Sequence, residues 1–300
     1  MKKLSNFYQV SQISEELKDR LRKLRLIRLS DGRFDVMGNV DFVGLVLSSL
    51  REVPIRIRRV TGDFRCYNNN LTTLEGAPER VDGDFDCYHN SLSSLEGAPK
   101  FVGGDFNCIQ SILASLNGAP ERVDGNFYCD NNRLTSLEGA PKYVGGDFYC
   151  YNNQLTSLEG APKYVGGDFE CNYNKLTSLE GAPKFVGGDF KCHNNQLTTL
   201  NGAPERVDGN FWCYNNQLTT LEGAPKYVGG NFICSYNQLT SLNGAPERVD
   251  GNFYCYNNQL TSLEGAPKYV DGDFLCYRNF KHFTEKEVRK LIDVKGKVVV

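Results

Sequence analysis

One pattern of apolar and polar positions repeats every 21 residues from position 64 to position 270. In the copy that spans residues 146–166, Phe148 and Cys150 are separated by a single residue, and Leu155 and Leu158 follow. Apolar residues at i and i+2 have the period of a strand with one buried face. Because 21 residues cannot bury a core alone, we expect the copies to stack on one another as a solenoid.

Turn residues divide each copy into short segments. We expect a strand over residues 147–151 and a turn at Asn152–Asn153. Gly160-Ala161-Pro162 supplies a second bend and Gly166-Gly167 a third, so the backbone should close one coil per repeat. This spacing leaves no room for a helix inside a repeat.

The fixed positions carry a family resemblance. The pattern Phe148-x-Cys150-x-x-Asn153-x-Leu155-x-x-Leu158 resembles the LxLxxNxLxxL segment of leucine-rich repeats, with Phe and Cys in place of two leucines. The Leu-Thr-Ser-Leu run followed by proline is similar to the short repeats of bacterial secreted effectors. The near-identical copies also resemble uncharacterised repeat proteins of tailed phages and giant viruses.

The resemblance implies a mainly β fold: a right-handed, leucine-rich-repeat-like solenoid with one parallel sheet and α-helical caps at both ends. It also implies a buried asparagine column that bonds the turns of successive rungs together. In the third copy Ser111 replaces the asparagine, and we expect a weak point there. The column is Asn69, Asn90, Asn132, Asn153, Asn174, Asn195, Asn216, Asn237, Asn258 and Asn279.

The two ends depart from the repeat, as stacked arrays require. We expect an N-terminal cap over residues 1–37, made of a helix from Ser14 to about Arg25 and a hairpin around residues 30–32. The solenoid should span residues 38–280, with an atypical first rung at 38–61 and 21-residue repeats from 62.

A C-terminal helix–strand cap should follow over residues 281–300. It opens with Thr284 and Glu287, three positions apart, which is the spacing of a capping box. A short helix to about Ile292 and the segment 294–300 should cover the last rung.

Eleven cysteines occur at one per repeat, and an odd column of identical positions offers no natural pairing. We therefore expect free, buried thiols and a reducing, cytoplasmic location, in the host cytoplasm if the protein is viral. The net charge is -2, and no stretch approaches the roughly 20 apolar residues of a membrane span. We expect no membrane partner, no cofactor and no metal site.

Three columns of side chains flank the two buried strand positions and should line a concave face. The first column, which precedes the core phenylalanine, holds seven aspartates, and the three together carry a formal charge of about -8. The middle column, between Phe and Cys, is the most varied, and the third, after Cys, is rich in tyrosine. We expect partner contacts from both at Tyr128, Tyr149, Tyr151, Glu170, Lys191, Trp212, Tyr214, Ile233, Tyr254 and Tyr256.

An acidic, tyrosine-rich face favours a protein partner with a basic or mixed-charge surface and disfavours nucleic acid. The basic N-terminal cap, with Arg56, Arg58 and Arg59, is an alternative site for nucleic acid or an acidic protein, and the convex face is a further alternative binding surface. Tyrosine ladders and turn aspartates also occur for purely structural reasons.

No serine or repeat cysteine has a recurring histidine beside it, so the partners for nucleophilic catalysis are missing and we expect no enzyme. The hypothesis is a protein-binding module that acts by occupancy, for example a phage or viral protein that binds or inhibits a host factor. The alternative is a structural or assembly protein that self-associates.

Overall fold

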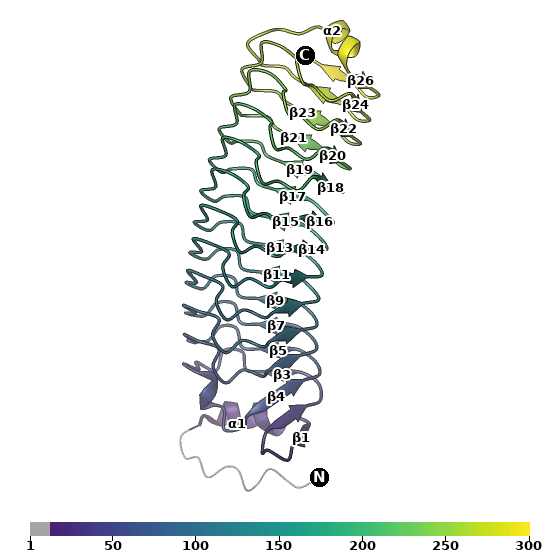
Figure 1. Cartoon of the computed structure of the whole chain (residues 1–300). Helices are drawn as coiled ribbons and strands as arrows, with labels where there is room; N and C mark the ends of the chain where they lie inside the picture. The colour runs from purple at the N-terminus through teal and green to yellow at the C-terminus, as the bar shows by residue number, and fades with distance from the viewer. Residues whose placement is uncertain (1–12) are drawn as a thin grey trace. The chain divides into compact units, whose positions relative to one another are not determined.

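Figure 1 shows the computed structural model, which describes residues 13–300; Lys2 and Lys3 of the basic N-terminal cap lie outside this range. Two sets of short strands alternate along the chain. One set begins at the core phenylalanine of each repeat and the other ends at the core valine; we call them the phenylalanine strands and the valine strands. Residues 13–134 with 138–144 form one compact unit, and residues 135–137 with 145–300 form a second.

In the first unit, α1 (Glu15–Arg22) precedes an antiparallel hairpin of β1 (Leu26–Arg28) and β2 (Phe34–Val36). The valine strands continue from β2 in parallel as β4 (Ile57–Val60), β6 (Arg80–Val81), β8 (Phe101–Val102), β10 (Arg122–Val123) and β12 (Tyr143–Val144). The phenylalanine strands are β3 (Val40–Asp41), β5 (Phe64–Arg65), β7 (Phe85–Asp86), β9 (Phe106–Asn107) and β11 (Phe127–Tyr128).

The second unit repeats this arrangement. Its phenylalanine strands are β13 (Phe148–Tyr149), β15 (Phe169–Glu170), β17 (Phe190–Lys191), β19 (Phe211–Trp212), β21 (Phe232–Ile233), β23 (Phe253–Tyr254), β25 (Phe274–Leu275) and β27 (Val298–Val299). Its valine strands are β14 (Tyr164–Val165), β16 (Phe185–Val186), β18 (Arg206–Val207), β20 (Tyr227–Val228), β22 (Arg248–Val249), β24 (Tyr269–Val270) and β26 (Asp293–Val294).

The predicted parallel β solenoid is confirmed, with two corrections. The expected strand over residues 147–151 is only the two residues of β13; the N–H of Cys150 still donates to the Glu170 carbonyl at 2.9 Å, and the chain turns at Asn152, where φ is 52°. The expected single sheet is two sheets, since the return segment before each turn also pairs with its neighbours through its valine. Both the hairpin and the capping box are present, and Thr284 and Glu287 each accept the other's backbone N–H at 3.2 and 2.8 Å.

The core consists of identical side chains stacked rung on rung. The core phenylalanines, one per repeat from Phe64 to Phe274 at 21-residue intervals, are at most 1% exposed, and neighbouring rings such as Phe106 and Phe127 lie parallel with centroids 5.2 Å apart. Each fully buried phenylalanine stabilises the fold by about 1.5–3 kcal/mol through removal of apolar surface from water. The repeat therefore derives its stability from neighbours rather than from its own 21 residues.

The asparagine column binds the rungs together, as the resemblance implies. Asn174 is buried; its Oδ1 accepts the N–H of Leu155 in the preceding rung at 2.9 Å. Its Nδ2 donates to the carbonyls of Cys150 in that rung and Cys171 in its own, both at 3.1 Å. One amide side chain thus satisfies turn groups that burial would otherwise leave unpaired.

A glycine is required wherever the next rung's backbone crosses the end of an aspartate. A Cβ added to Gly167 would collide with Oδ1 of Asp147 in the preceding rung. Gly160 is required for a different reason, because its φ of +89° lies in the left-handed region. These two constraints explain why glycine recurs at both positions in every repeat.

Ser111 interrupts the asparagine column, and its buried Oγ has no hydrogen-bond partner within the described chain. In the rung before it, Asn90 accepts from Leu71 N at 3.0 Å and donates to the carbonyls of Cys66 and Cys87 at 3.1 and 2.9 Å. A serine side chain is too short to span this set of groups.

Replacing Ser111 by asparagine should therefore raise the free energy of unfolding by about 1 kcal/mol, because the longer side chain reaches Leu92 N and the carbonyls of Cys87 and Cys108. Amide hydrogen exchange over residues 108–115 should slow. The exposed Ala114→Asn is the matched control and should change neither quantity. Equal exchange in wild type and Ser111→Asn would show that the ladder does not limit stability at this rung.

All eleven cysteines are free thiols and buried, as predicted. Burial raises the pKa of thiols such as Cys66 and Cys171, and raises that of Cys276, in the last rung before β27, to about 12. Labelling of the native protein by a thiol-specific maleimide should therefore be slow at pH 8, with Cys276 reacting first. In concentrated denaturant all eleven should react within the mixing time. Rapid labelling of most thiols in the native protein would contradict this packing.

Candidate functional site

The middle column of the second unit is a continuous row on the phenylalanine strands. Strand register places Tyr149 opposite Glu170, Glu170 opposite Lys191 and Lys191 opposite Trp212. The row continues through Ile233 to Tyr254. All six side chains are half-buried, so each packs against its neighbours and still presents a surface. Sequence and structure agree that these residues share one face; Tyr128 takes the same position on β11 of the first unit.

Lys191 is held in a cage of carboxylates beneath the tryptophan. Its Nζ lies 2.7 Å from Glu170, 3.3 Å from Asp168 and 3.5 Å from Asp189. The same nitrogen lies 5.0 Å from the Trp212 ring centroid, within the range of a cation–π contact. Burial lowers the pKa of Lys191, but the hydrogen bond to Glu170 and the nearby carboxylates outweigh it and raise that pKa. The ammonium therefore stays charged, and its cation–π contact holds one face of the Trp212 ring in place.

The first-column acids have a structural role that the sequence interpretation left open. Asp147 Oδ1 accepts the backbone N–H of Asp168 at 2.7 Å, and Asp168 in turn accepts that of Asp189 at 2.8 Å. Asn210 accepts the N–H of Asn231 in the same way at 2.7 Å, so either side chain completes the ladder. The ladder uses one oxygen per residue, and the negative charge of the aspartates is additional to what the fold requires.

Hydrogen bonds from the first column also fix the rings of the middle column. Tyr149 donates to Asp147 Oδ2 at 2.8 Å, and Tyr254 accepts from Asn252 Nδ2 at 2.9 Å. Large rings held in one orientation lose little entropy when a partner binds. Rings held in this way are more typical of a recognition surface than of mobile, exposed side chains.

The third column does not lie wholly on this surface, which corrects the sequence expectation. Tyr151, Tyr214 and Tyr256 are half-buried as expected. Four others are buried: Asp130, Asn172, His193 and Ser235. Ser235 is short and lies between the tyrosines of the two adjacent rungs, whereas the His193 ring packs against Tyr214 and Trp212. Where aromatic rings follow in consecutive rungs they stack, with 4.4 Å between the centroids of His193 and Tyr214 and 4.7 Å between Tyr256 and Tyr277.

The valine strands carry a second exposed pattern that sequence reasoning missed. The guanidinium of Arg206 lies 4.1 Å from the ring centroid of Tyr227, and that of Arg248 lies 4.4 Å from Tyr269. Each arginine also pairs with the aspartate two residues later, at 2.6 Å. The signal was the alternation of Ala-Pro-Glu-Arg-Val-Asp with Ala-Pro-Lys-Tyr-Val-Gly copies, which places arginine and aromatic residues in one column.

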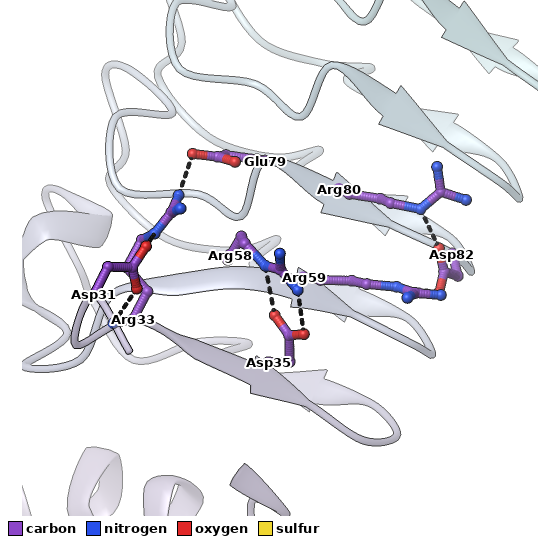
Figure 2. Close-up of polar contacts among 8 residues, drawn as sticks. All are labelled: Asp31, Arg33, Asp35, Arg58, Arg59, Glu79, Arg80 and Asp82. Carbon is purple, nitrogen blue, oxygen red and sulfur yellow. Dashed lines mark hydrogen bonds and ion pairs between the residues drawn. The ribbon is translucent and has the colours of Figure 1, made fainter. Parts of the chain in front are cut away.

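The basic alternative site is largely neutralised by acids. Arg58 forms a two-point contact with Asp35 at 2.9 and 2.5 Å, and Arg59 pairs with Asp82 at 2.5 Å. Figure 2 shows these contacts with the neighbouring ones made by Asp31, Arg33, Glu79 and Arg80. Guanidinium groups committed to carboxylates are weaker ligands for phosphate, so this end of the first unit favours nucleic acid less than the sequence alone indicated.

Within residues 13–300 no helix is both long and apolar enough to cross a membrane. The same range contains no cluster of three or more His, Cys, Asp or Glu side chains arranged to hold a metal ion.

No protein-family model matches the sequence, and no curated protein matches it. Solved structures do. YopM from Yersinia enterocolitica WA-314 aligns over 80% of this chain with a TM-score of 0.53 and 20% identity, and this chain spans 60% of that one. A leucine-rich effector, YopM from Yersinia pestis, aligns over 86% of this chain and 88% of its own at 17% identity and a TM-score of 0.46.

The functional domain of InlJ from Listeria monocytogenes, which includes a cysteine ladder, aligns over 80% of this chain and 68% of its own at 16% identity and a TM-score of 0.47. The likeness to the Yersinia enterocolitica structure is one of fold. It confirms the leucine-rich-repeat-like architecture that the spacing of phenylalanine, cysteine, asparagine and leucine indicated.

Proposed function

We propose that this leucine-rich-repeat-like solenoid is a non-enzymatic protein-binding module that acts by occupancy through the phenylalanine strands of its second unit. The observation that supports it most is the row from Tyr149 to Tyr254, in which Trp212 packs against the caged Lys191 and hydrogen bonds hold the rings of Tyr149 and Tyr254. Half-buried tryptophan and tyrosine held in one orientation are the side chains that dominate the energy of protein interfaces. The surplus of first-column carboxylates favours a partner with a basic or mixed-charge surface.

Free, buried thiols are typical of a reducing compartment, so we propose a cytoplasmic location. A phage or viral origin, with a host factor as the target, stays a hypothesis that rests on the sequence resemblance.

Affinity capture from the native cell, read by mass spectrometry, tests the function. Wild-type protein should retain a specific protein, and Trp212→Ala should lose it. Phe185→Ala is the matched control, because Phe185 is an exposed aromatic residue on a valine strand of the same unit. Equal capture by all three proteins would contradict the proposed face.

Self-association is the second candidate. Phe280 and Leu291, near the last rung, are 72% and 61% exposed, and β26 and β27 are edge strands. Exposed apolar side chains beside open strand edges favour contacts between copies. Light scattering separates the two functions, because a concentration-dependent dimer that Leu291→Lys abolishes would favour assembly over partner binding.

A further inference from the structure

The tyrosine of the third column is displaced by one residue in two rungs. One rung reads Tyr151-Asn152, but the next reads Asn172-Tyr173, which places a short side chain in the column and the tyrosine at the turn. Tyr173 has a left-handed φ of 53° and is 56% exposed. Its ring meets the edge of His193, with centroids 5.8 Å apart. The same exchange occurs at Ser235-Tyr236.

This displacement opens a gap in the aromatic stack. Adjacent strands are about 4.8 Å apart, so Tyr151 and His193, two rungs apart, are separated by about twice that distance. Only the Asn172 side chain stands between them in the column. A pocket of about 390 Å³ lies here, lined by Tyr151, Asn152, Glu170, Asn172 and Tyr173.

One of the residues that line this pocket, Asn172, has a buried polar atom without a partner within residues 13–300, and two residues of the next rungs have one as well. Asn172 is 6% exposed, and its Oδ1 has no hydrogen-bond partner among the described residues. His193, also 6% exposed, leaves its Nδ1 without one, and so does Trp212 at Nε1. Burial and the nearby charge of Lys191 lower the pKa of His193 to about 4, so its ring is neutral and adds no positive charge. An amide oxygen only accepts hydrogen bonds, so the group that satisfies Asn172 must be a donor.

The charge at the pocket narrows the choice of donor. Glu170 lines the pocket, and its carboxylate shares the single ammonium of Lys191 with Asp168 and Asp189, so the group beside the pocket has two formal negative charges in excess. A cation is therefore favoured over a neutral or anionic ligand. The walls offered by Tyr151 and Tyr173 are aromatic, and a planar cation can stack on such rings where an ammonium cannot.

We propose that this pocket receives the guanidinium group of an arginine side chain from the partner protein, stacked on the tyrosine rings and donating to Asn172 Oδ1 and the Glu170 carboxylate. The proposal rests on the proposed protein-binding function and specifies what the partner must present. The exposed Tyr173 ring has an edge contact with His193. Rotation of this ring about its side-chain bonds breaks that contact and admits the guanidinium group. Trp212, two rungs further along the row, then anchors a neighbouring part of the partner.

Titration of the full-length, isotope-labelled chain with N-acetyl-L-arginine amide, followed by amide NMR, tests this pocket, which we call the arginine slot, without knowledge of the partner. Signals of residues 151–152 and 170–173 should shift and saturate. N-acetyl-L-lysine amide should bind roughly fivefold more weakly, as expected when about 1 kcal/mol of stacking is lost.

The double change Asn172→Tyr with Tyr173→Asn restores the order of the preceding rung and should abolish arginine binding. The turn accepts asparagine, because Asn152 has φ 52° at the equivalent position. The matched control makes the same exchange at Ser235 and Tyr236 and should bind as wild type does. Glu170→Gln, which keeps the shape of the pocket, should weaken arginine binding roughly fivefold through loss of one charge-assisted hydrogen bond.

Absence of saturable shifts at these residues, equal binding of the lysine compound, or unchanged binding by the Asn172→Tyr, Tyr173→Asn protein would each overturn the arginine slot. The proposed protein-binding function is tested separately from the arginine slot. Arginine binding without any captured protein would support the slot and contradict the binding module, whereas a captured protein that Trp212→Ala releases, without arginine binding, would do the reverse.

Discussion

Replacing Asn174 by alanine should lower the free energy of unfolding by about 3 kcal/mol, the largest effect on stability that we expect from a polar side chain in this molecule. The change leaves Leu155 N and the carbonyls of Cys150 and Cys171 without their shared partner in a buried turn. Each such group costs about 1–3 kcal/mol when burial leaves it unpaired. Urea unfolding, with hydrogen exchange over residues 150–175 to localise the loss, measures the effect.

Gln154→Ala is the matched control, since Gln154 lies in the preceding turn and is exposed. It should change stability by less than about 0.5 kcal/mol. If Asn174→Ala were no more harmful than this control, the asparagine ladder would be a consequence of the fold rather than a cause of its stability.

Replacing Trp212 by alanine should weaken binding of the captured partner about 30-fold, equivalent to about 2 kcal/mol, mainly through faster dissociation. The ring packs over Lys191 and beside His193 and Tyr214, so its loss removes the centre of the aromatic row. Trp212→Phe keeps a ring at the site and should retain most of the affinity. Surface plasmon resonance on the purified partner measures both rates.

The first-column aspartates should mainly affect the association rate. Asp147→Asn with Asp168→Asn removes two charges and preserves the ladder, because Asn210 already serves in it. This protein should associate more slowly and with a weaker salt dependence, and this change should exceed the change in its dissociation rate that follows from loss of the Asp168 contact to Lys191. Unchanged binding by Trp212→Ala would move the binding surface to the valine strands or to the basic end of the first unit.

Local spacing was sufficient to predict the parts of the fold that repeat. Phe148 and Cys150 lie two residues apart, so they had to share a strand face, and a constant 21-residue offset required that face to stack on its copies. The capping box at Thr284 and the hairpin around Gly32 follow equally local rules. These features depend on contacts within one rung or with an identical neighbour, which a single sequence contains.

The rest depends on which side chains meet across rungs. Asn172 and Ser235 were placed on the exposed face by counting positions, but their burial is decided by the larger rings above and below them. The displaced tyrosines at 173 and 236 were visible as an exchange of letter order, and that signal was not used. The second sheet was also missed, because a two-residue pairing such as Arg206–Val207 leaves almost no periodic trace.

Apart from the rung of Ser111, the repeats accept and donate hydrogen bonds through equivalent groups at both edges, and this makes the rung, rather than the residue, the unit in which the chain can change. Loss of residues 168–188 would join Gly167 to Asp189, and the Asp147 carboxylate would then meet the N–H of Asp189 in place of that of Asp168. The core would close unaltered, but the binding row would lose Glu170 and bring Tyr149 beside Lys191. Duplication or loss of one 63-base segment of coding sequence is therefore enough to change the recognition surface and leaves the stacked core intact.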